Sequence, residues 1–296
     1  MARLLAAALA LLLSGPTPPA SLSDAPSRFA ILDGNRIHYK VVGSGARTLV
    51  FVHGWTCDMS VWRLQVPAFA PRARVILVDL PGHGRSDAPE ISYTMDLFAK
   101  AIDAVLRDAG VSRATLIGHS MGTPVVREFY RQHPEKTEAL VAVDGAFRAL
   151  FTQEDAQKLL VPYRGPEYTH ALERFADYMV PADQAALRDE LKHVMTKTPQ
   201  RVAINAFENM IDPANFREDP IRVPLLNVLA TSSRWPADYA DSVRKLCPAA
   251  EFHMMDGVGH FLMLQKPEEF NATLAGFLEK PRDESPLKNE TLLPGV

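Results

Sequence analysis

Residues 116 to 123 read Leu-Ile-Gly-His-Ser-Met-Gly-Thr and contain the pattern Gly-x-Ser-x-Gly. The apolar run Ala114 to Ile117 predicts a buried strand, and the residues from Val125 onward predict a helix. Ser120 is therefore expected on the turn between them, with its hydroxyl exposed at a helix N-terminus that favours negative charge. Gly118 and Gly122 fit this turn, because side chains there would collide where strand and helix cross.

The composition is that of a globular protein with a large core. The chain has 296 residues, of which 47% are hydrophobic, and a formal net charge of -3. This content suffices for a packed core. No basic or acidic tract is present, so we do not expect nucleic-acid binding. The histidines are not spaced as in a metal-binding motif, and we expect neither a metal nor a cofactor. The oligomeric state stays open.

Both ends of the chain are predicted to lie outside the fold. Arg3 followed by the apolar run Leu4 to Leu13 is typical of a secretory signal peptide within residues 1–25, cleaved after Ala20 or Ala25. The run is about half the roughly 20 apolar residues of a membrane helix, although an uncleaved N-terminal anchor is an alternative. We therefore expect a secreted or periplasmic protein without a stable membrane span after processing. The polar residues 281–296 are expected to be disordered.

Eight short runs, apolar or alternating, predict strands, and helical patterns lie between most of them. Met95 to Ala109, for example, has Thr94 as its N-cap and Gly110 after its end. This alternation predicts an α/β fold with a mostly parallel sheet flanked by helices, whose ligands bind at the carboxyl ends of the strands. The predicted strands are Phe29–Leu32, Arg36–Val42, Thr48–Val52, Arg74–Val78, Ala114–Ile117, Ala139–Val143, Leu225–Leu229 and Phe252–Met255.

One long interval breaks the alternation. Residues 145–219 contain no convincing strand. Their sequence pattern is typical of helices and is rich in Met, Phe and Tyr. Because this interval follows the sixth strand, it is predicted to be a helical cap over the active face. Residues 26–144 and 220–280 then form the core domain.

A serine nucleophile needs a base, and the base needs an acid that orients it. His260 is the candidate base, since it lies on a glycine-rich loop directly after the last strand. Serine stands where an acid is usually found, after the seventh strand. Asp144, at the carboxyl end of the sixth strand, is therefore the first candidate acid, with an ordinary turn as the alternative. Asp238 and Asp241 are held in reserve.

The chemistry also needs two N–H donors for the oxyanion. The backbone of Met121, directly after the serine, is one candidate. The other is the backbone of Trp55, because Gly54 permits a tight turn after the strand that ends at Val52. The side chain of Trp55 remains available as an apolar wall.

Taken together, these motifs resemble those of α/β-hydrolase fold proteins from Phe29 to Leu278. The resemblance rests on four motifs in order: His53-Gly54-Trp55, the loop Asp79 to Ser86, Gly118 to Gly122, and Gly259-His260-Phe261 followed by Pro267 and Phe270. It implies an eight-stranded sheet and a Ser-acid-His triad at Ser120 and His260. Asp144 takes the acid role by analogy with members that place the acid after the sixth strand.

These features lead to a functional hypothesis with open alternatives. We expect hydrolysis of a small, largely apolar carboxylic ester or lactone through an acyl-enzyme, with Ser120 as nucleophile and His260 as base. Carbon–carbon bond hydrolysis and acyl transfer on the same triad are alternatives, as is a weakly catalytic small-molecule-binding protein. The two cysteines, Cys57 and Cys247, fall at opposite ends of the expected sheet and are predicted to be free thiols.

Overall fold

The computed structural model describes residues 21–231 and 235–280. Most of the predicted signal peptide, residues 1–20 of 1–25, lies outside the described residues, and so does the whole predicted tail, 281–296. Within the described ranges, no helix has the length and apolarity needed to cross a membrane.

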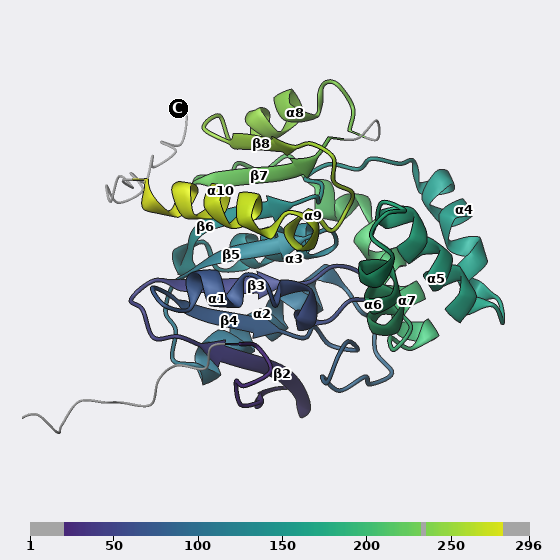
Figure 1. The fold of residues 1–296 in the computed structure, drawn as a ribbon, viewed down its shortest axis with the longest axis horizontal. Helices are drawn as coiled ribbons and strands as arrows, with labels where there is room; N and C mark the ends of the chain where they lie inside the picture. Colours follow the sequence, from purple (N-terminus) through teal and green to yellow (C-terminus); the bar gives the residue numbers. More distant parts are fainter. Residues whose placement is uncertain (1–20, 232–234, 281–296) are drawn as a thin grey trace, which may run out of the picture.

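Eight strands form one sheet in the order β1-β2-β4-β3-β5-β6-β7-β8 (Figure 1). β1 and β2 are antiparallel to their neighbours, whereas β4, β3, β5, β6, β7 and β8 are parallel. The predicted mostly parallel sheet is confirmed. Continuous apolar runs form its centre, as a sheet covered on both faces requires. The strands are β1 (Arg28–Leu32), β2 (Asn35–Val42), β3 (Thr48–Val52), β4 (Arg74–Val78), β5 (Ala114–His119), β6 (Thr137–Val143), β7 (Leu225–Ala230) and β8 (Glu251–Met255).

Helices cover the sheet, and Figure 1 shows α1 and α10 in front of it. α2 illustrates why such a segment is helical. The Thr94 side chain accepts a hydrogen bond from the N–H of Leu97 at 3.0 Å, and Gly110 follows the helix with a φ of 65°. The helices around the sheet are α1 (Val66–Phe69), α2 (Met95–Asp108), α3 (Gly122–Gln132), α8 (Tyr239–Leu246), α9 (Leu262–Gln265) and α10 (Pro267–Glu279).

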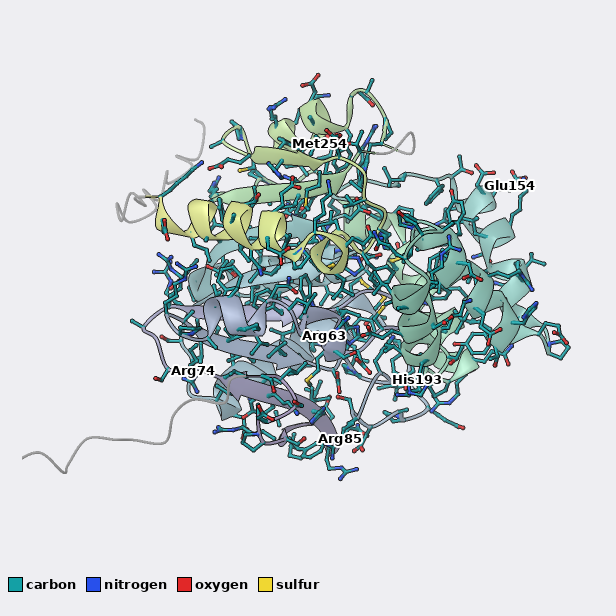
Figure 2. All side chains as sticks on the ribbon, in the orientation of Figure 1. Arg63, Arg74, Arg85, Glu154, His193 and Met254 are labelled. Atoms are coloured by element: carbon teal, nitrogen blue, oxygen red, sulfur yellow. The ribbon has the colours of Figure 1, made fainter. Side chains whose placement is uncertain are left out.

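Four further helices lie between β6 and β7 in the sequence. Figure 1 shows them grouped beyond one end of the strands. We call residues 153–210 the helical insert; the domain boundaries at 144 and 220 remain predictions. One contact between the insert and the rest of the chain involves Arg63, which Figure 2 labels. Its guanidinium donates to Glu190 of the insert at 2.6 Å. The insert consists of α4 (Gln153–Arg164), α5 (Tyr168–Met179), α6 (Ala185–Met195) and α7 (Gln200–Met210).

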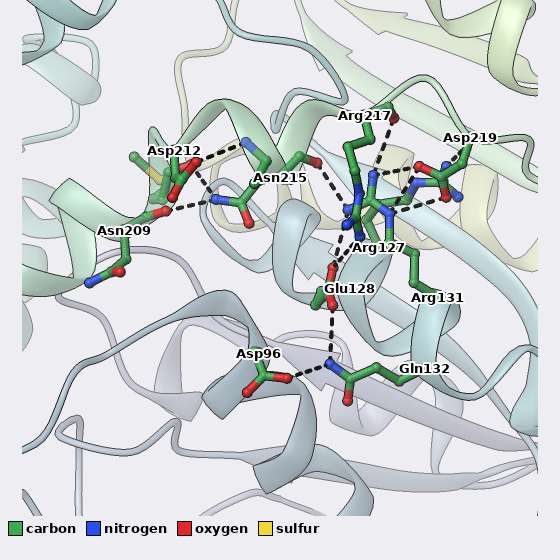
Figure 3. Close-up of polar contacts among 12 residues, drawn as sticks. Asp96, Arg127, Glu128, Arg131, Gln132, Asn209, Asp212, Asn215, Arg217 and Asp219 are labelled. Atoms are coloured by element: carbon green, nitrogen blue, oxygen red, sulfur yellow. Dashed lines mark hydrogen bonds and ion pairs between the residues drawn. The ribbon is translucent and has the colours of Figure 1, made fainter.

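The segment that returns from the insert to β7 is fastened to α3 (Figure 3). Arg131 of α3 donates to both carboxylate oxygens of Asp219, at 2.9 to 3.1 Å, and the buried Arg127 donates to the same residue. Burial lowers the pKa of Arg127 to about 10. Because α3 begins at Gly122, two residues after Ser120, these arginines tie the segment that follows the insert to the helix that follows the predicted nucleophile.

The register of the parallel strands places several loops side by side. Val52 pairs with Gly118, and His119 pairs with Val143. Further along the sheet, beyond β6, Ala230 of β7 pairs with Met255 of β8. The residues that follow β3, β5, β6 and β8 therefore emerge at the same edge of the sheet, next to the insert.

Candidate active site

Ser120 occupies the predicted turn between β5 and α3. Its φ is 53°, in the left-handed region, and its N–H donates to the carbonyl of Val143 at 3.0 Å. The flanking glycines are required by close backbone contacts. A Cβ on Gly118 would lie 2.3 Å from the carbonyl oxygen of Gly122, and a Cβ on Gly122 would lie 2.6 Å from that of Val52.

Asp144 follows β6 and reaches His260. Its N–H donates to the Val228 carbonyl at 2.8 Å, and its Oδ1 accepts from the N–H of Ala230 at 3.0 Å. Its Oδ2 lies 2.7 Å from Nδ1 of His260, and the aspartate side chain is fully buried. Because the carboxylate accepts, the proton on this side of the imidazole is at Nδ1, which leaves Nε2 for another partner.

The two reserve carboxylates have other partners. Asp238 pairs with Arg148 at 2.6 Å, and Asp241 pairs with Arg244 at 3.3 Å. Both aspartates are exposed, with 69% and 78% of their side-chain surface accessible. Of the three candidate acids, Asp144 is thus the one that contacts His260.

The backbone of His260 is held from two sides. Its N–H donates to the carbonyl of Met179, at the end of α5, at 3.0 Å. Its own carbonyl oxygen lies 2.9 Å from Nε2 of His119. The preceding glycine makes the first contact possible, since a Cβ on Gly259 would lie 2.4 Å from the Met179 carbonyl oxygen. The helical insert therefore takes part in placing this histidine.

The sequence pattern points to neither His119 nor Met179. His119 lies inside the motif around Ser120, and this position is a signal that could have drawn attention to it. The Met179 carbonyl carries no sequence signal, because its contact with His260 depends on how the insert packs on the core.

The two backbone groups predicted to bind an oxyanion lie at the ends of neighbouring strands. Gly54 and Ser120 are so close that a Cβ on the glycine would lie 2.9 Å from Cβ of the serine. Across residues 21–231 and 235–280, the N–H groups of Trp55 and Met121 donate no hydrogen bond to another backbone or side-chain group. Both donors thus remain available beside the serine.

A buried histidine supports this turn. Nδ1 of His53 donates to the Gly54 carbonyl at 2.8 Å, and Nε2 accepts from the N–H of Leu80 at 3.0 Å. Since the second contact needs an unprotonated nitrogen, the imidazole is neutral. Burial also lowers the pKa of His53. The residue therefore supports the turn rather than supplying a charge.

Aromatic side chains of the insert surround Trp55. Its indole meets the rings of Tyr163, Phe175 and Phe207 nearly edge-on, with centroids 5.0 to 5.5 Å apart. Its Nε1 donates to the Ala203 carbonyl at 2.7 Å. Burial raises the pKa of Tyr163 to about 12. The surroundings next to the predicted oxyanion donor are therefore mostly apolar.

His38 and His253 have structural contacts. His38 lies 2.7 Å from the buried carboxylate of Asp79, which also accepts from the N–H groups of Met59 and Arg85. His253 contacts Glu269 of α10 at 3.1 Å. In the described part of the chain, no group of three or more His, Cys, Asp or Glu side chains is arranged to hold a metal ion.

Comparisons with known proteins agree with this architecture. Residues 49–273 match the sequence profile of the alpha/beta hydrolase family. A 2-hydroxy-6-oxononadienedioate/2-hydroxy-6-oxononatrienedioate hydrolase from Paraburkholderia phymatum is 31% identical over 84% of this chain and 93% of its own. A pimeloyl-(acyl-carrier protein) methyl ester esterase from Aeromonas hydrophila is 27% identical over 78% of this chain and 94% of its own.

A solved structure shows the same fold. An esterase from Exiguobacterium antarcticum superposes with a TM-score of 0.78 at 20% identity, covering 86% of this chain and 100% of the esterase. The eight-stranded sheet, the turn at Ser120 and the family profile agree with one another. The chain therefore belongs to the alpha/beta hydrolase family.

Proposed function

We propose that this protein is a serine hydrolase that cleaves a small, largely apolar carboxylic ester or lactone through an acyl-enzyme. The observation that carries the proposal is the 2.7 Å contact between Asp144 and His260 at the sheet edge where Ser120 also emerges. A buried carboxylate on Nδ1 favours the imidazolium that forms when Nε2 takes a proton. This is the requirement for general-base activation of a serine.

The reaction follows from the roles of these groups. Ser120 Oγ attacks the substrate carbonyl while His260 takes the hydroxyl proton. The tetrahedral oxyanion accepts hydrogen bonds from the N–H groups of Trp55 and Met121. His260 then protonates the leaving alkoxide, which departs as an alcohol. A water molecule attacks the acyl-enzyme in the same way, which releases the carboxylic acid and restores Ser120.

The rings around Trp55 support an apolar substrate. Tyr163, Phe175 and Phe207 pack their rings around the indole of Trp55, whose backbone N–H is a predicted oxyanion donor. Such surroundings accept an alkyl or aryl group more readily than a carboxylate, since burial of an unpaired charge is costly. The relative named as a methyl ester esterase supports ester cleavage.

Carbon–carbon bond hydrolysis is a second candidate. The relative from Paraburkholderia phymatum is named for a substrate that carries a ketone and two carboxylates and no ester. The same serine and histidine could act on its ketone. The apolar rings beside Trp55 favour the ester, because a dicarboxylate needs positive partners.

Steady-state hydrolysis of nitrophenyl esters with acyl chains of two to twelve carbons tests the proposal, together with simple lactones and a 2-hydroxy-6-oxo-dienedioate. We expect turnover of short or medium esters, and loss of that turnover in Ser120→Ala. Turnover of the dienedioate alone would support the second candidate. No turnover of any of these substrates would contradict hydrolysis and favour the binding-protein alternative. A faster rate with added alcohol acceptors would indicate acyl transfer.

A further inference from the structure

The imidazole of His119 links the predicted nucleophile to the loop that carries the predicted base. His119 is the last residue of β5 and directly precedes Ser120. Its Nε2 lies 2.9 Å from the carbonyl oxygen of His260, and this oxygen can only accept, so Nε2 is the donor. The two imidazole rings also pack together, with centroids 4.6 Å apart.

The surroundings of His119 hold its ring in one place. Only 1% of its surface is exposed. Trp62 meets the ring edge-on at 6.2 Å between centroids, and Phe261 packs on it at 5.0 Å. A Cβ on Gly54 would lie 3.0 Å from its Nδ1. The ring thus contacts the turn after β3, the core and the His260 loop.

We propose that His119 is a positioning residue: its Nε2–H holds the carbonyl of His260 and thereby sets the imidazole of His260 against Ser120. The proposal rests on the proposed function. Two other backbone contacts of this loop come from elsewhere: the N–H of His260 donates to the carbonyl of Met179 in the insert, and the N–H of Gly259 donates to the side chain of Gln265. The His119 contact ties the loop to the residue adjacent to the nucleophile.

This arrangement predicts an effect on chemistry rather than on substrate affinity. A displacement of a catalytic group by about 1 Å can cost about 100-fold in rate. His119 lies behind the Ser120 turn, against Gly54, Trp62 and Phe261, so its loss does not remove a substrate contact. The expected change is therefore in kcat, with KM almost unchanged.

Three variants separate the hydrogen bond from the packing. His119→Phe keeps a buried ring and removes the donor. His119→Gln places an amide N–H at nearly the same distance from the backbone. The side chain of His119→Asn is too short for its amide to reach the carbonyl of His260. This variant replaces His119→Phe if the Phe variant does not fold. Each is assayed with the best nitrophenyl ester of the parent, and rates are divided by the concentration of folded protein, which far-ultraviolet circular dichroism checks.

We expect His119→Phe and His119→Asn to lower kcat by about 10- to 100-fold with less than a twofold change in KM. His119→Gln should recover most of the lost rate. Parent-like kcat in the Phe or Asn variant would overturn the positioning role, and so would equal losses in all three variants, since packing alone would then explain them. An inactive parent would instead count against the proposed function.

Discussion

Oδ2 of Asp144 lies 2.7 Å from Nδ1 of His260, although 116 residues separate them in the chain. The carboxylate is fully buried, and its other oxygen accepts from the N–H of Ala230 at 3.0 Å. Asp144 also has a φ of 45°, which turns the chain sharply at the end of β6. A strained, buried carboxylate with a histidine partner is a typical feature of a functional site.

Replacement of this carboxylate tests its role as the acid. Asp144→Asn retains an acceptor for Ala230 and loses the charge that favours the imidazolium, so kcat should fall by about 10⁴-fold. The measurement is kcat on a nitrophenyl ester, with far-ultraviolet circular dichroism as a check on folding. Asp238→Asn and Asp241→Asn are the matched controls and should retain parent rates. Parent-like rates in Asp144→Asn would show that this carboxylate is not the acid.

Gly259→Ala tests the contact between the insert and the His260 loop. The added methyl group would lie 2.4 Å from the carbonyl oxygen of Met179, so the loop or the end of α5 must move. We expect kcat to fall by about 100-fold, because the imidazole of His260 moves with its backbone. Gly276→Ala in α10 is the control, since its added methyl meets no atom within 4 Å. Equal activity of the two variants would mean that the loop adjusts without displacing the base.

The buried His83 should make the folded protein less stable in acid. Burial lowers the pKa of His83 from an ordinary value of 6.5 to about 3. Between these values the unfolded chain binds a proton that the folded chain does not, so the free energy of unfolding falls as the pH falls, by about 1.4 kcal/mol per pH unit for this group. Burial also lowers the pKa of His53, which adds a change of the same sign.

Urea denaturation between pH 4.5 and 7.5 measures this dependence, because the loss of stability begins near pH 6.5 and continues at lower pH. His83→Gln should have a smaller loss of stability on acidification than the parent. His170→Gln changes a histidine whose side chain is 60% exposed and should follow the parent. An identical slope for the parent and His83→Gln would contradict the prediction, because it would mean that His83 binds a proton equally well in the folded and unfolded chain.

The two thiols should be free and unreactive in the folded protein. Cys57 and Cys247 are both buried, and neither forms a disulfide in the structure. Burial raises the pKa of each thiol, which lowers the fraction of reactive thiolate. At pH 8, a disulfide-exchange reagent should modify both thiols slowly in the folded protein. It should modify both thiols readily once the protein is denatured without reductant. Absence of reactive thiols after denaturation would contradict this prediction.

Local sequence patterns were sufficient for the sheet and for helices α2 and α3 beside it. Continuous apolar runs marked the buried parallel strands, and Thr94 and Gly110 marked the two ends of α2. Strand ends were less accurate. β5 continues through Gly118 to His119 because these residues pair with Ala142 and Val143 of β6, and a glycine gives no strand signal by itself.

The contacts at the site were harder to predict than the residues. Ser120 and His260 stand in local motifs, and the position of Asp144 after β6 suggested its contact with His260. Two hydrogen bonds of the His260 backbone have no sequence pattern of their own: its carbonyl accepts from His119 of β5, and its N–H donates to the carbonyl of Met179. They form only when the last loop packs against β5 and against the insert. Tertiary packing of this kind is not encoded in the periodicity of any one segment.

The most direct test of the account is to locate the residue that a fluorophosphonate modifies. The parent protein is treated with the reagent and digested, and the adduct is mapped by mass spectrometry. We predict one phosphonyl group per chain, on Ser120, with labelling at least 1000-fold slower in Asp144→Asn, by analogy with the rate loss of triad variants, and none in Ser120→Ala. An adduct on another residue, or no adduct on a protein that hydrolyses esters, would contradict the assignment of Ser120 as nucleophile.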